Sequence, residues 1–129
     1  MTSTQHHFNV QVYYEDTDHS GVVYHSNYLK YFERAREAVI GPERLVDLWK
    51  NRGLGFAVYK AEIHYQEGAE FGDLLDIRST VRRESDYRLV WNQEAWRPDG
   101  TRPAVRAEIH LVCVDRSKSL KPIPPVPLE

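Results

Sequence analysis

Carboxylate side chains gather in one short stretch of the sequence, close to the expected start of a helix. Residues 16–25 hold Asp16, Asp18, Gly21 and His25. A carboxylate can attack a carbonyl carbon or activate a water molecule. The unsatisfied N–H groups at a helix N-terminus carry partial positive charge and can stabilise an oxyanion as it forms. The stretch therefore has, in outline, the parts of a hydrolytic site.

The same residue types also build ordinary loops. Aspartate is common in turns and as a helix cap, so Asp16 and Asp18 have a purely structural interpretation. Gly21 has one too, because glycine readily takes a positive φ angle. A histidine near a helix start, such as His25, is more often a surface or capping residue than a catalyst. Spacing alone does not decide between the two interpretations.

The elements on either side of this stretch follow from two hydrophobic periods. Apolar residues alternate with polar ones over residues 8–14, which predicts a half-buried strand. From about Ser26 the apolar residues recur at three- and four-residue steps, which predicts a helix capped by Ser26 or Asn27. A Gly-Pro pair at residues 41–42 should end this helix, and a short second helix should run from there to about Asn51.

The rest of the chain predicts four more strands joined by short turns. Period-two alternation returns over residues 57–65, 75–81, 87–96 and 105–113. The proline-rich tail, about residues 117–129, suits neither a helix nor a central strand and should lie extended. One long helix followed by four successive strands predicts an α+β class, with a mostly antiparallel sheet packed on that helix.

Whole-chain quantities exclude several classes of protein. A chain of 129 residues predicts a single domain over residues 1–129. The net charge of −2 makes nucleic acid and anionic membrane surfaces poor partners. We find neither a signal peptide pattern nor an apolar run of ~18 residues, and therefore expect no membrane span and a cytoplasmic location. The single cysteine, Cys113, agrees with a reducing compartment.

Three segments resemble one known family. The stretch VYYEDTD-SGVVYHSNYLKYFERARE, residues 12–37, resembles the signature of hotdog-fold acyl-CoA thioesterases of the 4-hydroxybenzoyl-CoA thioesterase and YbgC-like type. The segment GFAVYKAEIHYQEGAEFGDLLDI looks like the family's second strand and following turn, and AEIHLVCVD looks like its last strand. The similarity covers about Val10 to Asp115, so it extends well beyond the signature.

The resemblance implies a fold and an assembly. Members have the hotdog fold, in which a curved, mostly antiparallel five-stranded sheet wraps a long central helix. Two such sheets generally pair edge to edge, so a homodimer or a homotetramer is expected, and an unpaired sheet edge fits that expectation. Active sites of the family lie at the dimer interface, which implies that neither chain alone holds a complete site.

The resemblance also implies roles for individual residues. Asp18 matches the family's catalytic carboxylate, which acts either as a nucleophile or as a general base, and the sequence does not choose between them. The backbone N–H of His25 matches a donor to the thioester carbonyl, and its side chain matches a catalytic histidine. Asp16 is expected to hold the loop. The residues expected to bind or shape the substrate are Tyr14, Gly21, Val22, Tyr24, Asn27 and Tyr28.

No cofactor is expected apart from the coenzyme A of the substrate. A thioester is already activated, so a carboxylate and an oxyanion hole should suffice without a metal. The phosphates of coenzyme A need basic partners, and the first candidates are Arg82, Arg83 and Arg88 near the turn between the third and fourth strands. Further basic residues, Arg116, Lys118 and Lys121, follow the last strand.

Other reactive residues have structural interpretations. Cys113 is expected to be a buried packing residue rather than a nucleophile. His6 and His7 lack the further ligands of a zinc site. Glu33 lies on the central helix, where another branch of hotdog thioesterases places its carboxylate. It falls within the FERAR part of the signature, so we assign it a supporting role.

Three functions remain open at this point. Acyl-CoA hydrolysis leads. A hotdog hydratase or dehydratase also uses an acid and a histidine, although its short Asp-to-His motif is absent, and a non-catalytic acyl-CoA-binding module is third. The acyl group is either short and aliphatic or aromatic, and its carrier is CoA or acyl carrier protein. Aromatic residues that could line an aromatic acyl pocket are Tyr24, Tyr28, Tyr59, Tyr65 and Trp91.

Overall fold

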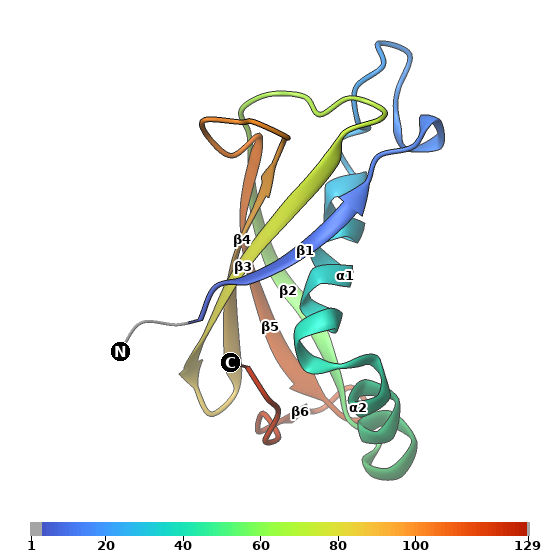
Figure 1. The fold of residues 1–129 in the computed structure, drawn as a ribbon. Helices are drawn as coiled ribbons and strands as arrows, with labels where there is room; N and C mark the ends of the chain where they lie inside the picture. Colours follow the sequence, from blue (N-terminus) through green and yellow to red (C-terminus); the bar gives the residue numbers. More distant parts are fainter. Residues whose placement is uncertain (1–3, 129) are drawn as a thin grey trace.

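The computed structural model of the chain describes residues 4–128, which form one antiparallel sheet with a long helix against it (Figure 1). The helix, α1, spans Asn27–Ile40, and the strand order is β1-β3-β4-β5-β2. The α+β class and the antiparallel sheet predicted from the sequence are confirmed. The strands are β1 (His6–Gln11), β2 (Gly55–Tyr65), β3 (Leu74–Ser85), β4 (Arg88–Trp96), β5 (Val105–Val114) and β6 (Leu120–Lys121).

Two details of the sheet differ from the sequence prediction. The sheet has six strands rather than five, because β6 pairs with the end of β5 just before the proline-rich tail. A strand of two residues is too short for alternation to be visible. The first strand also ends earlier than expected, at Gln11, because residues 14–16 form a 3₁₀ turn, η1 (Tyr14–Asp16).

Helix α1 lies on the sheet through one apolar face. Its buried apolar residues are Tyr28, Tyr31, Phe32, Ala35 and Ile40. The predicted break is confirmed: Gly41, with φ 101°, ends α1, and Pro42 begins α2 (Pro42–Asp47). A π-helical turn, η2 (Leu48–Arg52), continues α2 and leads into β2.

One buried polar network crosses the interface between α1 and the sheet. Gln93 on β4 donates to the carbonyl of Phe32, at 2.9 Å, and to the hydroxyl of Ser79, at 3.0 Å. Its side-chain oxygen accepts a hydrogen bond from Arg36 at 2.9 Å. Buried polar groups that are paired in this way tie the helix to the middle of the sheet in one register.

Strand β2 is an edge of the sheet, paired only with β5 among the described residues. A bulge between Val58 and Lys60 shifts its register. The strand itself is confirmed, but its alternation does not produce a buried face, because Val58 (49% exposed), Tyr59 (46%) and Tyr65 (48%) are all open to solvent.

Candidate active site

The loop between β1 and α1 carries the candidate catalytic residues. It is held against the loop that precedes β3 by a bridge between Val22 and Glu70 and by a hydrogen bond of 2.8 Å from the N–H of Val23 to the carbonyl of Ala69. Figure 1 shows both loops at the same end of the molecule, beside the start of α1. Thr17 and Val23 form a further bridge within the loop itself.

Asp16 holds this loop together through its side chain and its backbone. Its carboxylate accepts a hydrogen bond from the N–H of Tyr13 at 2.9 Å. Its carbonyl accepts from the N–H of Tyr24 and from the side-chain amide of Asn27, both at 2.9 Å. The geometry agrees with the loop-holding role expected for Asp16.

Asp18 is half-exposed and is oriented by Ser20. Its Oδ1 accepts hydrogen bonds from the Ser20 hydroxyl at 2.6 Å and from the Ser20 N–H at 2.8 Å. The Ser20 hydroxyl, followed by the Ser20 N–H, lowers the pKa of Asp18 below its usual value. Asp18 is therefore ionised at neutral pH. Its Oδ2 accepts no hydrogen bond from residues 4–128, so this oxygen can meet a substrate.

A second aspartate in the chain has the same local geometry without the same surroundings. Asp115 accepts hydrogen bonds from the hydroxyl and the N–H of Ser117, at 2.7 and 2.9 Å. The Ser117 hydroxyl, followed by the N–H of Ser119, which also donates to Asp115, lowers the pKa of Asp115. Aspartates commonly bind backbone groups two residues ahead in turns. The feature specific to Asp18 is thus that its loop leads directly into α1.

The start of α1 has no side-chain cap, contrary to the expectation for Ser26 or Asn27. Ser26 occupies the N-cap position but takes helical angles and makes no side-chain capping bond. Asn27 is already the first helical residue, and its amide is engaged with Asp16. The N–H groups of His25 and Ser26 donate to no acceptor within residues 4–128. These two donors remain available for a ligand oxygen.

His25 is exposed and lies between two tyrosines. Its ring centroid is 4.6 Å from that of Tyr24 and 6.2 Å from that of Tyr65. The Tyr65 hydroxyl donates to the His25 carbonyl at 3.0 Å. Tyr65, the last residue of β2, therefore holds the backbone just before the start of α1.

The other predicted substrate residues have different surroundings. Gly21 has φ 83°, so the turn after Asp18 needs its conformational freedom. Tyr14 is 76% exposed and stacks on Phe71, with ring centroids 4.4 Å apart. Val22 packs against Gly68, where a Cβ atom would lie 2.9 Å from a Val22 methyl group.

Tyr28 is a core residue in this chain, although the sequence placed it among the substrate residues. It is only 2% exposed, and its hydroxyl accepts a hydrogen bond from the N–H of Ala69 at 3.2 Å. Burial raises the pKa of its hydroxyl. Tyr28 therefore supports the loop that holds Val23, and its predicted contact with a substrate stays a prediction.

Two polar residues of the site did not stand out in the sequence. Ser20 orients Asp18, and the Asp-x-Ser spacing that is common in turns could have predicted this contact. Tyr31 is buried beside Asp16, and its hydroxyl has no hydrogen-bond partner within the described residues. Burial, followed by the charge of Asp16, raises the pKa of Tyr31. Helical spacing predicts that Tyr31 is a core residue, but it does not predict that the Tyr31 hydroxyl lacks a hydrogen-bond partner.

The three arginines proposed for coenzyme A do not lie together. Arg82 and Arg88 lie on one face of the sheet and Arg83 on the other, as the register of β3 and β4 requires. Arg83 donates to the carbonyl of Ile123 in the tail. Arg88 pairs with Glu84 at 3.6 Å and lies 5.2 Å from the ring centroid of Tyr59. Arg83 therefore contacts the tail, and the assignment of the three arginines to coenzyme A stays a prediction.

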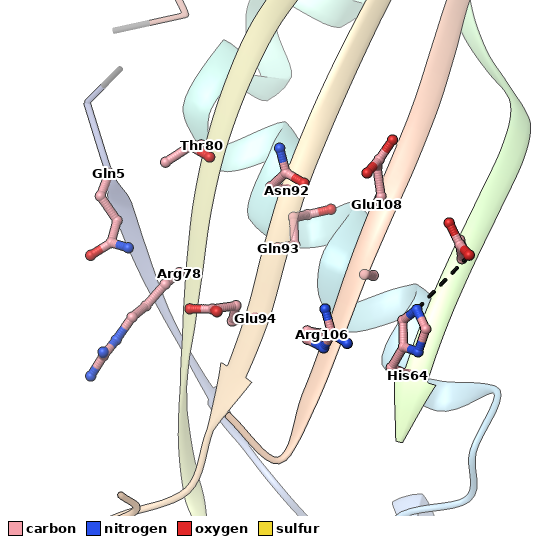
Figure 2. Close-up of a pocket in the computed structure, with 11 residues that line it drawn as sticks. Gln5, His64, Arg78, Thr80, Asn92, Gln93, Glu94, Arg106 and Glu108 are labelled. Carbon is pink, nitrogen blue, oxygen red and sulfur yellow. Dashed lines mark ion pairs between the residues drawn. The ribbon is translucent and has the colours of Figure 1, made fainter. Parts of the chain in front are cut away.

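A hollow of about 370 Å³ lies elsewhere on the described chain. Figure 2 shows its polar side chains on β3, β4 and β5 with α1 behind the sheet, among them Arg78, Glu94, Arg106 and Glu108. No predicted site residue lines it. An antiparallel sheet commonly has one solvated face, and the mixed charges here are of that kind.

The remaining sequence expectations concern metals, cysteine and membranes. Within residues 4–128, no group of three or more side chains is placed to hold a metal ion. His7 instead pairs with Asp76 at 3.0 Å. Cys113 is buried in the core, as predicted, and burial raises the pKa of its thiol. No helix in this part of the chain is long and apolar enough to cross a membrane.

Comparison with known proteins agrees with these observations. The thioesterase-like superfamily matches residues 12–129. The acyl-CoA thioesterase YbgC of Haemophilus influenzae is 36% identical over 118 residues, which cover 90% of this chain and 85% of that protein. The acyl-CoA thioester hydrolase YbgC of Escherichia coli is 35% identical over 124 residues, which cover 95% and 90%.

Solved structures show the same fold. The 1,4-dihydroxy-2-naphthoyl-CoA thioesterase of Synechocystis superposes with a TM-score of 0.85 at 26% identity, covering 94% of this chain and 90% of that one. A probable thioesterase of Bartonella henselae gives a TM-score of 0.85 at 29% identity, covering 94% and 100%. The hotdog fold implied by the sequence resemblance is confirmed.

Proposed function

The chain belongs to the thioesterase-like superfamily and is a thioester hydrolase, and we propose that it hydrolyses acyl-CoA to a free acid and CoA at the loop before α1. One observation carries the proposal. An ionised carboxylate with one unengaged oxygen, on Asp18, lies in the loop that delivers the unengaged N–H groups of His25 and Ser26. A nucleophile or base and an oxyanion hole are the two parts that acyl transfer requires.

The reaction follows from these two parts. The thioester carbonyl oxygen accepts hydrogen bonds from the N–H groups at the start of α1. The Oδ2 atom of Asp18 either attacks the carbonyl carbon or removes a proton from an attacking water. The negative charge that develops on the carbonyl oxygen is stabilised by the N–H donors, and the C–S bond breaks as CoA thiolate leaves. On the nucleophilic route this leaves a mixed anhydride on Asp18, which water then hydrolyses to release the free acid and restore the carboxylate. Each donor of this kind typically contributes ~3–4 kcal/mol to transition-state stabilisation.

The His25 side chain has the freedom to assist. Its ring is exposed, and neither of its nitrogens is hydrogen-bonded within the described residues. In our proposal it protonates the leaving thiolate or orients the attacking water. No metal and no cofactor take part, because a thioester is already activated and a thiolate is a good leaving group.

The proposal extends to the carrier of the acyl group and to the oligomeric state of the protein. CoA is the preferred carrier, since the relatives named above are acyl-CoA thioesterases, and acyl carrier protein is the alternative. Arg82 and Arg88, on the same sheet face, are proposed to meet the CoA phosphates. The open edge of β2 supports a homodimer, and two such dimers can pair into a homotetramer. The cytoplasmic location expected from the sequence stays a prediction.

A panel of thioesters tests the function. Purified protein is incubated with acetyl-, butyryl-, benzoyl-, hydroxybenzoyl- and crotonyl-CoA, and released thiol is measured with a chromogenic reagent. Turnover of at least one saturated or aromatic ester with release of CoA supports the proposal. Consumption of crotonyl-CoA without release of thiol would identify a hydratase. Binding without any turnover across the panel would identify a non-catalytic module.

A further inference from the structure

Tyr65 contacts the candidate oxyanion hole, the N–H groups of His25 and Ser26, from outside the catalytic loop. Its hydroxyl donates a hydrogen bond of 3.0 Å to the carbonyl oxygen of His25. The two residues lie 40 positions apart in the sequence, so the contact is made by the fold and not by the loop itself. It depends on where β2 ends relative to the start of α1.

The His25 carbonyl needs a partner from outside the helix. Ser26 occupies the N-cap position of α1, and its carbonyl accepts a hydrogen bond of 3.2 Å from the N–H of Leu29. The residue before the N-cap contributes no carbonyl to the helical hydrogen bonds. Among residues 4–128, Tyr65 is the donor that the His25 carbonyl has.

The carbonyl of His25 and the N–H of Ser26 belong to one peptide group. In a trans peptide the C=O and the N–H point in opposite directions, so their partners lie at opposite ends of the group. A hydrogen bond to the oxygen polarises the group and strengthens a hydrogen bond from its N–H. The N–H of Ser26 has no acceptor within the described residues. The Tyr65 hydroxyl therefore makes this N–H a stronger donor to a ligand oxygen.

The ring of Tyr65 is held in place by its neighbours. Its centroid lies 5.9 Å from that of Tyr28 and 6.2 Å from that of His25, both edge to face. Tyr28 is itself fixed, since it is only 2% exposed and its hydroxyl accepts from the N–H of Ala69. Burial raises the pKa of Tyr65, so its hydroxyl is protonated and can donate at neutral pH.

A stronger donor at Ser26 matters most in the transition state. The carbonyl oxygen of a thioester is neutral in the ground state and becomes negatively charged as the carbonyl carbon is attacked. Hydrogen bonds to a charged acceptor are about twice as strong as those to a neutral one. The effect of Tyr65 should therefore appear in the rate of the chemical step more than in substrate binding.

We propose that Tyr65 is a positioning residue for the oxyanion hole: it fixes and polarises the His25–Ser26 peptide group, so that the N–H of Ser26 acts as a second donor beside that of His25. The inference rests on the proposed function and deepens it. One such donor is typically worth ~10²–10³ in rate, and polarisation strengthens a hydrogen bond by ~10–30%. Loss of the Tyr65 hydroxyl should therefore slow the chemical step by about two- to eightfold.

Single-turnover kinetics of Tyr65→Phe test the role. With enzyme in excess over the best ester of the panel, rapid quenching measures the rate of C–S cleavage, and its dependence on enzyme concentration gives the Kd of the substrate. Phenylalanine keeps the ring against Tyr28 and removes only the hydroxyl. The rate should fall by about two- to eightfold with little change in Kd. Tyr87→Phe is the matched control, at a tyrosine that is also 48% exposed, and should keep the parent rate.

A stronger donor at the same position separates polarisation from support of the loop. Replacement of Tyr65 by 3-fluorotyrosine keeps the ring and the hydroxyl but makes the hydroxyl more acidic and hence a better donor. At a pH where the fluorinated phenol is still protonated, the rate of C–S cleavage should rise in the order phenylalanine, tyrosine, 3-fluorotyrosine. A hydroxyl that only supports the loop would give equal rates for the last two, and that result would overturn the inference.

The outcomes separate this inference from the proposed function. A defect of Tyr65→Phe that is confined to Kd or to the thermal midpoint would also overturn the inference. If Tyr65→Phe does not fold, the parent and the fluorinated protein decide between the two roles. Asp18→Asn is measured alongside, and a full rate for that variant would contradict the proposed function rather than the role of Tyr65. A parent that cleaves no ester of the panel would contradict both.

Discussion

Asp18 and Asp115 show why residue type and local hydrogen bonding do not identify a catalytic group. Each accepts two hydrogen bonds from the serine two residues ahead, and each has a lowered pKa for that reason. Only Asp18 precedes the start of α1, where the N–H donors of His25 and Ser26 are unengaged within the described residues. A carboxylate in a loop that ends at such donors can act on a carbonyl group, whereas Asp115 lies in the turn between β5 and β6.

Asp18→Asn should lower kcat for acyl-CoA hydrolysis by ~10²–10⁴, the usual contribution of a positioned acid or base. Asparagine keeps the shape but can neither attack as a carboxylate nor take a proton, and it is tolerated in turns. Asp115→Asn is the matched control and should keep the parent kcat. Asp16→Asn should lower the thermal midpoint at least as clearly as the rate. If folded Asp18→Asn hydrolysed acyl-CoA within about threefold of the parent rate, the assignment of the catalytic carboxylate to Asp18 would be wrong. Glu33 would then be the next carboxylate to test.

Ser20→Ala should shift the acidic limb of the kcat/KM profile to higher pH. The Ser20 hydroxyl stabilises the ionised form of Asp18 and so lowers its pKa. Without the hydroxyl the pKa rises, so the inactive protonated form appears at a higher pH as the solution is acidified. A pH profile for one good substrate, with circular dichroism at each pH, measures the shift. Ser117→Ala, the equivalent change beside Asp115, should leave the limb where it is.

At the scale of elements, the two edges of the sheet are not equivalent. The β1 edge is short and is contacted by the tail, where His6 lies 2.9 Å from the carbonyl oxygen of Leu128. The β2 edge is eleven residues long, with apolar and aromatic side chains exposed. Long open edges are prone to pair with another chain. Strand β2 is therefore the element expected to form the interface between copies.

Ala61→Glu should separate the copies. Ala61 is exposed in one chain, so the change costs the isolated chain little. In a twofold pairing about Lys60, however, it sets two carboxylates near each other. Light scattering should give a multiple of 15.1 kDa for the parent and about 15.1 kDa for the variant, with activity lost in parallel. Ala38→Glu on exposed α1 surface is the control. A parent monomer at micromolar concentration would contradict the expected assembly.

At the scale of the whole molecule, coverage of the helix-bearing face is uneven. The tail packs beside β1 and the turn between β3 and β4: the N–H of Ile123 donates to the carbonyl of Asp86 at 2.7 Å, His6 contacts the carbonyl of Leu128, and Val126 and Leu128 pack on the core. The side toward β2 holds an apolar cavity of about 220 Å³ between α1, η2 and the sheet, and has no covering segment within residues 4–128. In the proposed homodimer, a second copy on the β2 side would cover this cavity.

Treatment of the protein with EDTA should leave its rate of acyl-CoA hydrolysis unchanged. In the proposed mechanism the reaction needs only a carboxylate and N–H donors, because sulfur activates the thioester carbonyl and the thiolate departs readily. The measurement is the rate of CoA release before and after dialysis against the chelator. Loss of turnover that returns with added metal would show that a metal takes part in the reaction.

Features that depend on residues close along the chain could be predicted from the sequence. Helical spacing and the Gly-Pro pair at 41–42 placed α1 and its end, because a helix is built from contacts three and four residues apart. Alternation placed β2 to β5 to within a few residues. The candidate loop was visible for the same reason, since Asp16, Asp18 and His25 are close along the chain.

Only the tertiary structure decided which distant residues meet. The split of Arg82 and Arg88 from Arg83 depends on strand register, and the burial of Tyr28 depends on the loop before β3. The cavity draws residues from 33 to 111, so no short pattern announces it. The buried position of Arg36 was likewise invisible, because a charged residue on a helix is normally exposed. Such contacts are set by the packing of elements far apart in sequence, which local patterns do not encode.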